Sequence, residues 1–247
     1  MSIRDCLTST TVLASAAALL SAAELLALLV QTRNSRPLSR RIFAAAATAA
    51  LAIAAAAAGA IATAAKTDLR FLPVSVLALG ALWFARAARF GREGSDDILL
   101  IVLVGLAGAS VPGAPEVLTR IWLSFIAAQL MLAYFVSGAA KLLGDKWLRG
   151  EAVGQVLSTR EYGLGRAGLY ETRHVVLILA TWATIAFEVT LPALFVLGGP
   201  LLWPAVAIGI SFHLGVALTM GLNRFVISFI AAYPSVIWAS SSYGLLS

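Results

Sequence analysis

The run HVVLILATWATIAFEVTLPALFVL at His174–Leu197 decides the fold class of this chain. It is longer than the roughly 20 apolar residues that a helix needs to cross the hydrocarbon core of a bilayer. Apart from His174 at its start, Glu188 is the one ionisable residue in this run. Because backbone polar groups inside lipid must be satisfied within the segment itself, a single run of this kind predicts a transmembrane helix.

Similar apolar runs lie on both sides of this one and are separated by polar connections, of which Gly144–Arg173 is the longest. They are Thr8–Val30, Ile42–Ala65, Phe71–Ala88, Ile98–Val111, Ile121–Leu143, Pro200–Gly221 and Arg224–Tyr243. Ile98–Val111 is short, so it is either a thin span or a re-entrant piece. The sequence therefore predicts an all-α, polytopic integral membrane bundle of about eight transmembrane helices, or seven, in one domain over residues 1–247. The first run lacks a basic segment before it, so we expect a retained helix and not a cleaved signal peptide.

The composition agrees with a membrane location. Hydrophobic residues make up 60% of the chain and charged residues only 12%, about half of the roughly 25% that a soluble domain carries. The net charge of +6 comes from short Lys and Arg clusters between apolar runs, as expected for loops near lipid headgroups. Nucleic acid is therefore not an expected partner, whereas membrane lipids are, and we expect a multi-pass protein of the cell membrane. The single cysteine, Cys6, indicates no redox compartment.

Ionisable residues inside a span cost about 2.5–3.5 kcal/mol each, so each needs a partner or a function. Four positions stand out: Glu24, Lys141, Glu188 and His213. For Glu24 we favour a hydrogen bond to a neighbouring helix. We expect Lys141, Glu188 and His213 to converge on a shared interior chamber.

Lys141 ends the fifth span, and a helix places Tyr134, Ser137 and Gly138 on the same face. Two interpretations stay open at this point. The lysine can extend its ammonium to the headgroups. Alternatively, in a dry pocket lined by that narrow polar face, it can act as a base near neutral pH.

Glu188 lies in the middle of its span with Thr181 and Thr184 on its face, and Pro192 one turn later predicts a kink or opening. His213 lies near the centre of the seventh span. Either side chain can serve as an interhelical hydrogen-bonding group or as a functional group. The only other histidine is His174, so a multi-histidine metal site is not available, although haem ligation by the two stays open.

The longest polar region, Gly144–Arg173, mixes aromatic and basic side chains, as is typical of segments at the headgroup level. An interfacial helix at Glu151–Thr159 and a lid over a site are both compatible with it. The side chains concerned are Trp147, Tyr162, Tyr170, Lys146, Arg149, Arg160, Arg166 and Arg173.

The run YFVSGAAKLLGDKWLRGEA at Tyr134–Ala152 resembles the core motif of the vitamin K-dependent γ-carboxylase-like family, the horizontally transferred transmembrane domain (HTTM). That pattern is roughly Y-x-x-x-G-x-x-K-L followed by W-x-x-G-x-A/S. FEVTLP at Phe187–Pro192 and FHLGVALTMGLNRF at Phe212–Phe225 are similar to the later helices of the family. The resemblance covers roughly Ile121–Tyr243 and does not extend to the alanine-rich first hundred residues.

The resemblance implies a quinone or hydroquinone cofactor and assigns Lys141 as the base that deprotonates it. Glu188 and His213 would complete the catalytic set, with Tyr134 and Trp147 against the cofactor. The chain ends soon after its last span, so we expect a short form without the soluble C-terminal domain of the carboxylases, and we do not expect peptide carboxylation. Short members of the wider family include maturation factors for secreted peptides.

Three functions follow from these observations. The first is a lipid-quinone-linked membrane enzyme or maturation factor, with a small peptide as its substrate. The second is a non-catalytic subunit or assembly factor that packs against other membrane proteins, which the smooth, alanine-rich second span favours. The third is a proton-coupled transporter using Glu188 and His213, although no internal repeat supports it.

Overall fold

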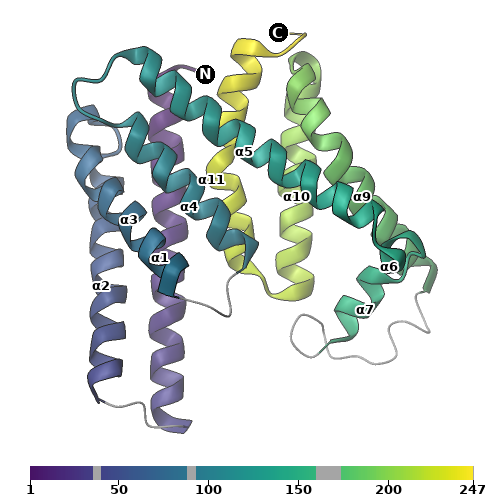
Figure 1. Ribbon diagram of the computed structural model, residues 1–247, viewed down its shortest axis with the longest axis horizontal. Coiled ribbons are helices and arrows are strands. Elements are labelled where there is room, and N and C mark those ends of the chain that lie inside the picture. Colours follow the sequence, from purple (N-terminus) through teal and green to yellow (C-terminus); the bar gives the residue numbers. More distant parts are fainter. Residues whose placement is uncertain (36–39, 88–92, 160–173, 247) are drawn as a thin grey trace. The chain divides into compact units, whose positions relative to one another are not determined.

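The computed structural model describes residues 1–35, 40–87, 93–159 and 174–246, and in these ranges all regular structure is helical (Figure 1). The elements are α1 (Ile3–Ser35), α2 (Arg40–Thr63), α3 (Thr67–Ala87), α4 (Gly94–Ala109), α5 (Glu116–Leu142), α6 (Asp145–Leu148), α7 (Ala152–Ser158), α9 (His174–Leu197), η1 (Gly199–Leu201), α10 (Leu202–Met220) and α11 (Asn223–Tyr243). Seven of the helices are long and apolar enough to cross a membrane: α1, α2, α3, α5, α9, α10 and α11. The predicted all-α membrane bundle is therefore confirmed.

The helix ends follow the sequence patterns closely. α9 has the predicted bounds, and α7 fills most of the predicted interfacial helix. α1 begins five residues earlier than its apolar core and continues to Ser35 through a polar stretch. A helix can extend in this way because Gln and Arg are good helix formers and charged turns are solvated beyond the hydrocarbon. α9 is continuous through Pro192, so this proline does not end the helix.

The short segment Ile98–Val111 forms α4, a helix of 16 residues. At about 1.5 Å per residue it is roughly 24 Å long, against a hydrocarbon core of about 30 Å. Half of its residues are buried, including Leu99, Val102, Leu103 and Leu106. α4 is therefore an internal member of its bundle and the one long helix in the described ranges that falls short of the spanning length.

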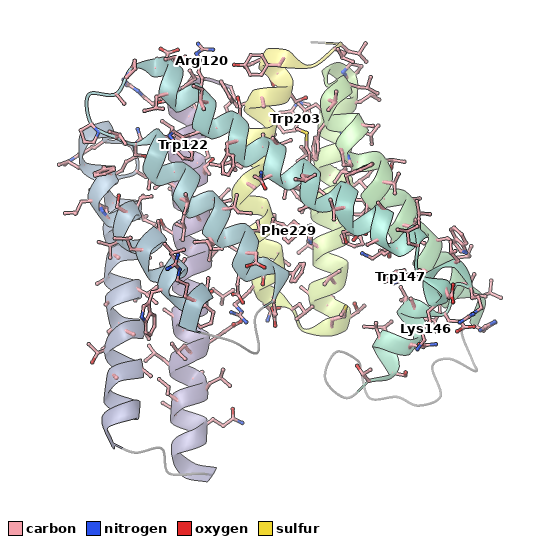
Figure 2. All side chains as sticks on the ribbon, in the orientation of Figure 1. Arg120, Trp122, Lys146, Trp147, Trp203 and Phe229 are labelled. Carbon is pink, nitrogen blue, oxygen red and sulfur yellow. The ribbon has the colours of Figure 1, made fainter. Side chains whose placement is uncertain are left out.

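Contacts between residues divide the chain into two compact units, and α5 and α11 pass through both. Unit 1 comprises residues 1–126 and 227–238. Within it α1 packs on α2, α2 on α3, and α3 on α4 (Figure 1). Small residues make this packing close, since Ala50, Ala57, Ala60 and Ala64 of α2 are all buried. Gly108 of α4 leaves the space that the Trp122 indole of α5 occupies (Figure 2).

Unit 2 comprises residues 127–226 and 239–247 and contains every side chain that the sequence assigned to the candidate site. α9 packs against α6, α7 and α10. At one end the chain closes on itself, because the N–H groups of Leu245 and Leu246 donate to the carbonyls of Val196 and Leu197. Gly198 and Gly199 adopt φ values of 67° and 54°, which make the tight turn from α9 into η1 possible.

Candidate functional site

The C-terminal half of α5 carries the residues on which the site is built. Tyr134, Ser137 and Lys141 recur at helical spacing and so lie on one face of this helix. Lys141 belongs to the last turn, where a cation interacts favourably with the exposed carbonyl groups of the helix end. The chain leaves the helix through a turn in which the N–H of Gly144 donates to the Lys141 carbonyl.

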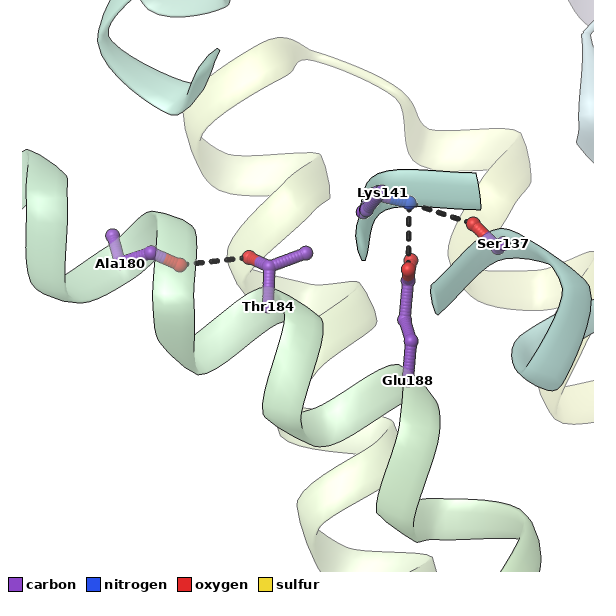
Figure 3. Close-up of polar contacts among 5 residues, drawn as sticks. All are labelled: Ser137, Lys141, Ala180, Thr184 and Glu188. Carbon is purple, nitrogen blue, oxygen red and sulfur yellow. Dashed lines mark hydrogen bonds and ion pairs between the residues drawn. The ribbon is translucent and has the colours of Figure 1, made fainter. Parts of the chain in front are cut away.

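Lys141 and Glu188 form an ion pair between α5 and α9 (Figure 3). The Lys141 Nζ lies 2.6 Å from Oε2 of Glu188 and donates at 2.6 Å to the Ser137 hydroxyl. The exposed fractions of the two side chains are 17% and 9%, so the pair is largely but not fully enclosed. Each charge compensates the other in a place where either alone would be costly.

The two helices meet closely at this point because Gly138 has no side chain. A Cβ atom at that position would lie 2.8 Å from Cγ2 of Val189, 3.0 Å from the Val189 nitrogen and 3.1 Å from the carbonyl carbon of Glu188. The α9 backbone therefore approaches α5 at the residue that carries the carboxylate. The small residue in the predicted narrow face thus brings Glu188 within reach of Lys141.

Trp147, on α6, covers the ammonium from outside the span. Its ring centre lies 4.9 Å from the Lys141 Nζ, within the range of a cation–π contact. Figure 2 labels Trp147 and Lys146 side by side on this short helix. The ammonium of Lys141 is thus bounded by a hydroxyl, a carboxylate and an aromatic face.

Tyr134 and His213 form a second buried pair, between α5 and α10. The Tyr134 hydroxyl lies 2.6 Å from the His213 Nε2, and the two residues are 3% and 1% exposed. Aromatic rings surround the pair: the Tyr134 ring meets Phe187 edge-on at 5.5 Å, and Phe187 stacks on Phe212 at 4.1 Å. The His213 imidazole also lies 6.1 Å from the ring of Phe225.

The structure brings the predicted site residues together as two pairs. Lys141 contacts Glu188, whereas His213 contacts Tyr134. Tyr134 and Lys141, the members of the two pairs on α5, are two helical turns apart. At about 1.5 Å per residue the two positions on α5 are roughly 10 Å apart. Phe187 and Glu188 are consecutive on α9 and contact Tyr134 and Lys141 respectively, so α9 contributes to both pairs. All three ionisable side chains point into unit 2 and none is exposed.

The two threonines predicted to share the face of Glu188 have different roles. Thr184 donates its hydroxyl at 2.9 Å to the Ala180 carbonyl of its own helix (Figure 3). Thr181, one turn further away, contacts the turn between α6 and α7, a partner that the sequence did not indicate. Glu24 is half-buried on α1 in unit 1. Several aromatic and basic residues of the predicted lid lie outside the described residues: Arg160, Tyr162, Arg166, Tyr170 and Arg173.

The fold and the site together define a class: a multi-pass helical membrane protein in which α5, α9 and α10 carry a buried ion pair and a buried tyrosine–histidine pair. Searches of protein-family models, curated proteins and solved structures find no match to this chain.

Proposed function

We propose that this chain is a membrane enzyme or maturation factor of the cell membrane that acts on a lipid quinol, with the Lys141–Glu188 pair exchanging the proton. The observation that carries the proposal is the ion pair itself. A proton donor and a proton acceptor lie 2.6 Å apart, beside a hydroxyl and under an aromatic ring. The resemblance of Tyr134–Ala152 to the γ-carboxylase-like motif supports the same choice of residues, since Lys141 matches the lysine of that motif.

The residues around the two pairs fit a quinone ring chemically. Trp147, Phe187, Phe212 and Phe225 provide flat apolar surfaces, which suit a planar ring. Lys141 and the Tyr134–His213 pair provide polar atoms at two places along α5, as two ring oxygens require. A bound quinol supplies an acidic ring hydroxyl and delocalises the charge left after its proton departs.

The chain's own residues then divide the task. Glu188 fixes the position of the Lys141 ammonium and can take its proton, because the two groups already share a short hydrogen bond. Ser137 holds the ammonium from the other side. Trp147 shields the pair from interfacial water, which strengthens its electrostatics. Tyr134 and His213 hold a second proton-bearing contact further inside the bundle.

One observation favours a second candidate, a non-catalytic subunit or assembly factor. In each pair, polar atoms from two different helices contact one another, as interhelical links in a membrane bundle do. On this interpretation the pairs hold α5, α9 and α10 together, and the function lies in docking to other membrane subunits.

Replacing Lys141 by arginine separates the two candidates. Arginine keeps the positive charge and can pair with Glu188, but it cannot release a proton in a protein. If the enzyme proposal is correct, the oxidation of a naphthohydroquinone in nanodiscs, with dissolved O₂ as the acceptor of its two electrons and two protons, should fall by at least about 100-fold. The melting temperature should change little. Lys146→Arg, at an exposed position on the adjacent α6, is the matched control and should retain full turnover.

Turnover that survives in Lys141→Arg, or no turnover by the unaltered protein, would overturn the enzyme proposal. The exchange of charges in Lys141→Glu/Glu188→Lys tests the subunit role. If the pair acts only as a link, the exchange restores the melting temperature lost in either single variant and also restores co-purification of partner subunits. An enzyme regains stability in the exchanged variant but not turnover.

A further inference from the structure

Thr181 connects α9 to the segment that carries Trp147. We call α6, α7 and the turn between them, residues 145–158, the cap. The Thr181 oxygen accepts a hydrogen bond from the Val153 N–H at 3.3 Å, and its hydroxyl lies 3.1 Å from the Gly150 carbonyl and 2.8 Å from the Leu177 carbonyl of its own helix. Thr181 is completely buried, so no water competes for these contacts.

The cap needs this partner because α7 begins without a side-chain cap of its own. The first N–H groups of a helix have no acceptor within the helix, and the residue at the N-cap usually supplies one. Here the N-cap is Glu151, and its side chain makes no such bond. Thr181 supplies the acceptor from another helix, to the second residue of α7, whichever of the two carbonyls receives its proton.

The same contact fixes the position of Trp147. Gly150 follows Trp147 closely in a turn where the Gly150 N–H donates to the Trp147 carbonyl at 3.0 Å and the Glu151 N–H donates to the Lys146 carbonyl at 2.9 Å. Gly150 has a φ of 74°, and a Cβ atom there would lie 2.9 Å from Cγ2 of Ile178 on α9. The turn is thus pressed against α9 on one side and carries Trp147 towards Lys141 on the other.

We propose that Thr181 is a positioning residue that caps α7 from α9 and thereby seats Trp147 over the Lys141 ammonium. The Thr181 hydroxyl on α9 holds the turn at Gly150, and this turn keeps Trp147 next to Lys141 at the end of α5. The structural part of this proposal stands by itself, and only its consequence for proton exchange rests on the proposed function.

The experiment compares Thr181→Val with Thr184→Val in nanodiscs. Each variant removes one hydroxyl from α9, but the hydroxyl of Thr184 donates to the Ala180 carbonyl of its own helix. Two signals are recorded: hydrogen–deuterium exchange of the peptide that covers α7, and the ¹⁵N–¹H resonance of the Trp147 indole, assigned by its loss in Trp147→Phe. Thr181→Val should speed exchange at the start of α7 by roughly tenfold, the factor that corresponds to one lost hydrogen bond, and should shift or broaden the indole resonance.

Thr184→Val should leave both signals unchanged. Thr181→Ser, which keeps the hydroxyl, should give the same two signals as the unaltered protein. Trp147→Phe should leave the start of α7 protected, because Thr181 and not Trp147 holds the turn. An unchanged indole resonance in Thr181→Val would overturn the proposal. If Thr181→Val does not fold, the other two variants test the proposal. Faster exchange at the start of α7 in Trp147→Phe would overturn the proposal, and so would a change of either signal in Thr181→Ser.

These signals do not depend on turnover. If the Lys141→Arg test fails while the cap responds as expected, the positioning role stands and the quinol function does not. If the quinol function holds, Thr181→Val should also reduce turnover, whereas Thr184→Val should not.

Discussion

Lys141, Glu188, Tyr134 and His213 are tolerated inside the helices because each contacts a polar partner on another helix. A lone Lys or Glu in hydrocarbon costs several kcal/mol, and a direct pair reduces this cost without removing it. The Lys141–Glu188 pair lies near the end of α5, where the lysine retains 17% exposure. The Tyr134–His213 pair is more completely buried, with exposed fractions of 3% and 1%. The charged pair therefore occupies the position where its burial costs least.

Tyr134→Phe tests the contact between Tyr134 and His213. The change removes only the hydroxyl that contacts His213 and leaves the ring packing on Phe187 intact. We expect a loss of about 1–3 kcal/mol in unfolding free energy, measured by denaturation in mixed micelles, because the buried imidazole nitrogen loses its partner. A double-mutant cycle with His213→Phe should give a coupling energy of at least about 0.5 kcal/mol. Strict additivity would show that the two side chains do not stabilise one another.

At the scale of the helices, close approach at glycine decides which side chains can meet. α9 reaches Lys141 only because Gly138 lets its backbone come within contact of α5. The neighbouring turn depends on a second glycine, since Gly150 has a positive φ and faces Ile178. Both glycines lie in the run Tyr134–Ala152, and both are needed there for the close approach of α9.

Gly138→Ala should separate the two helices and weaken the ion pair. The added methyl group would meet backbone atoms of Val189 and Glu188, which cannot move aside as a flexible side chain can. We expect a loss of about 1–3 kcal/mol in unfolding free energy, measured by denaturation in mixed micelles. Gly215→Ala on α10 is the matched control, because nothing lies within 4 Å of a Cβ atom there. The control should be neutral or stabilise its helix by up to about 1 kcal/mol. Equal losses in both variants would contradict this account.

At the scale of the whole molecule, the number of membrane crossings depends on α4. Within unit 1 the N-terminal part of α1 lies beside the turn after α2, since Thr8 donates to the Ala64 carbonyl. In Figure 1 the turn from α4 into α5 lies at the same end of unit 1 as the turn from α2 into α3. A helix of 16 residues can cross if the bilayer thins locally, which costs a fraction of a kcal/mol per Å. We therefore expect α4 to cross.

Cysteine labelling tests this crossing directly. The only native cysteine, Cys6, is fully buried, so the unaltered protein should not react with a membrane-impermeant maleimide. Lys66→Cys and Pro112→Cys, both at exposed positions, should react from the same side of the membrane. Gln31→Cys, at the far end of α1, should react from the opposite side. Reaction of positions 66 and 112 from opposite sides would show that α4 does not cross.

Local sequence determined the helices of this protein. Apolar runs of spanning length predict helices because lipid leaves the backbone no other partner, and the bounds of α9 could be predicted to the residue. Helical spacing by itself likewise places Tyr134, Ser137, Gly138 and Lys141 on one face of α5. The sequence by itself also identified Glu188 and His213 as buried ionisable groups that need a partner.

Only the tertiary structure decided which partners these groups have. Lys141 pairs with Glu188 and His213 with Tyr134 because α9 and α10 meet α5 at different turns. The spacing of residues within one helix does not predict which turn of a second helix lies beside it. The contact of Thr181 with the cap could not be predicted from the sequence for the same reason, since its partners lie about 30 residues earlier in the chain. Hydrophobicity fixes which segments are helices. The fit of individual side chains and glycines across helices fixes which polar atoms meet.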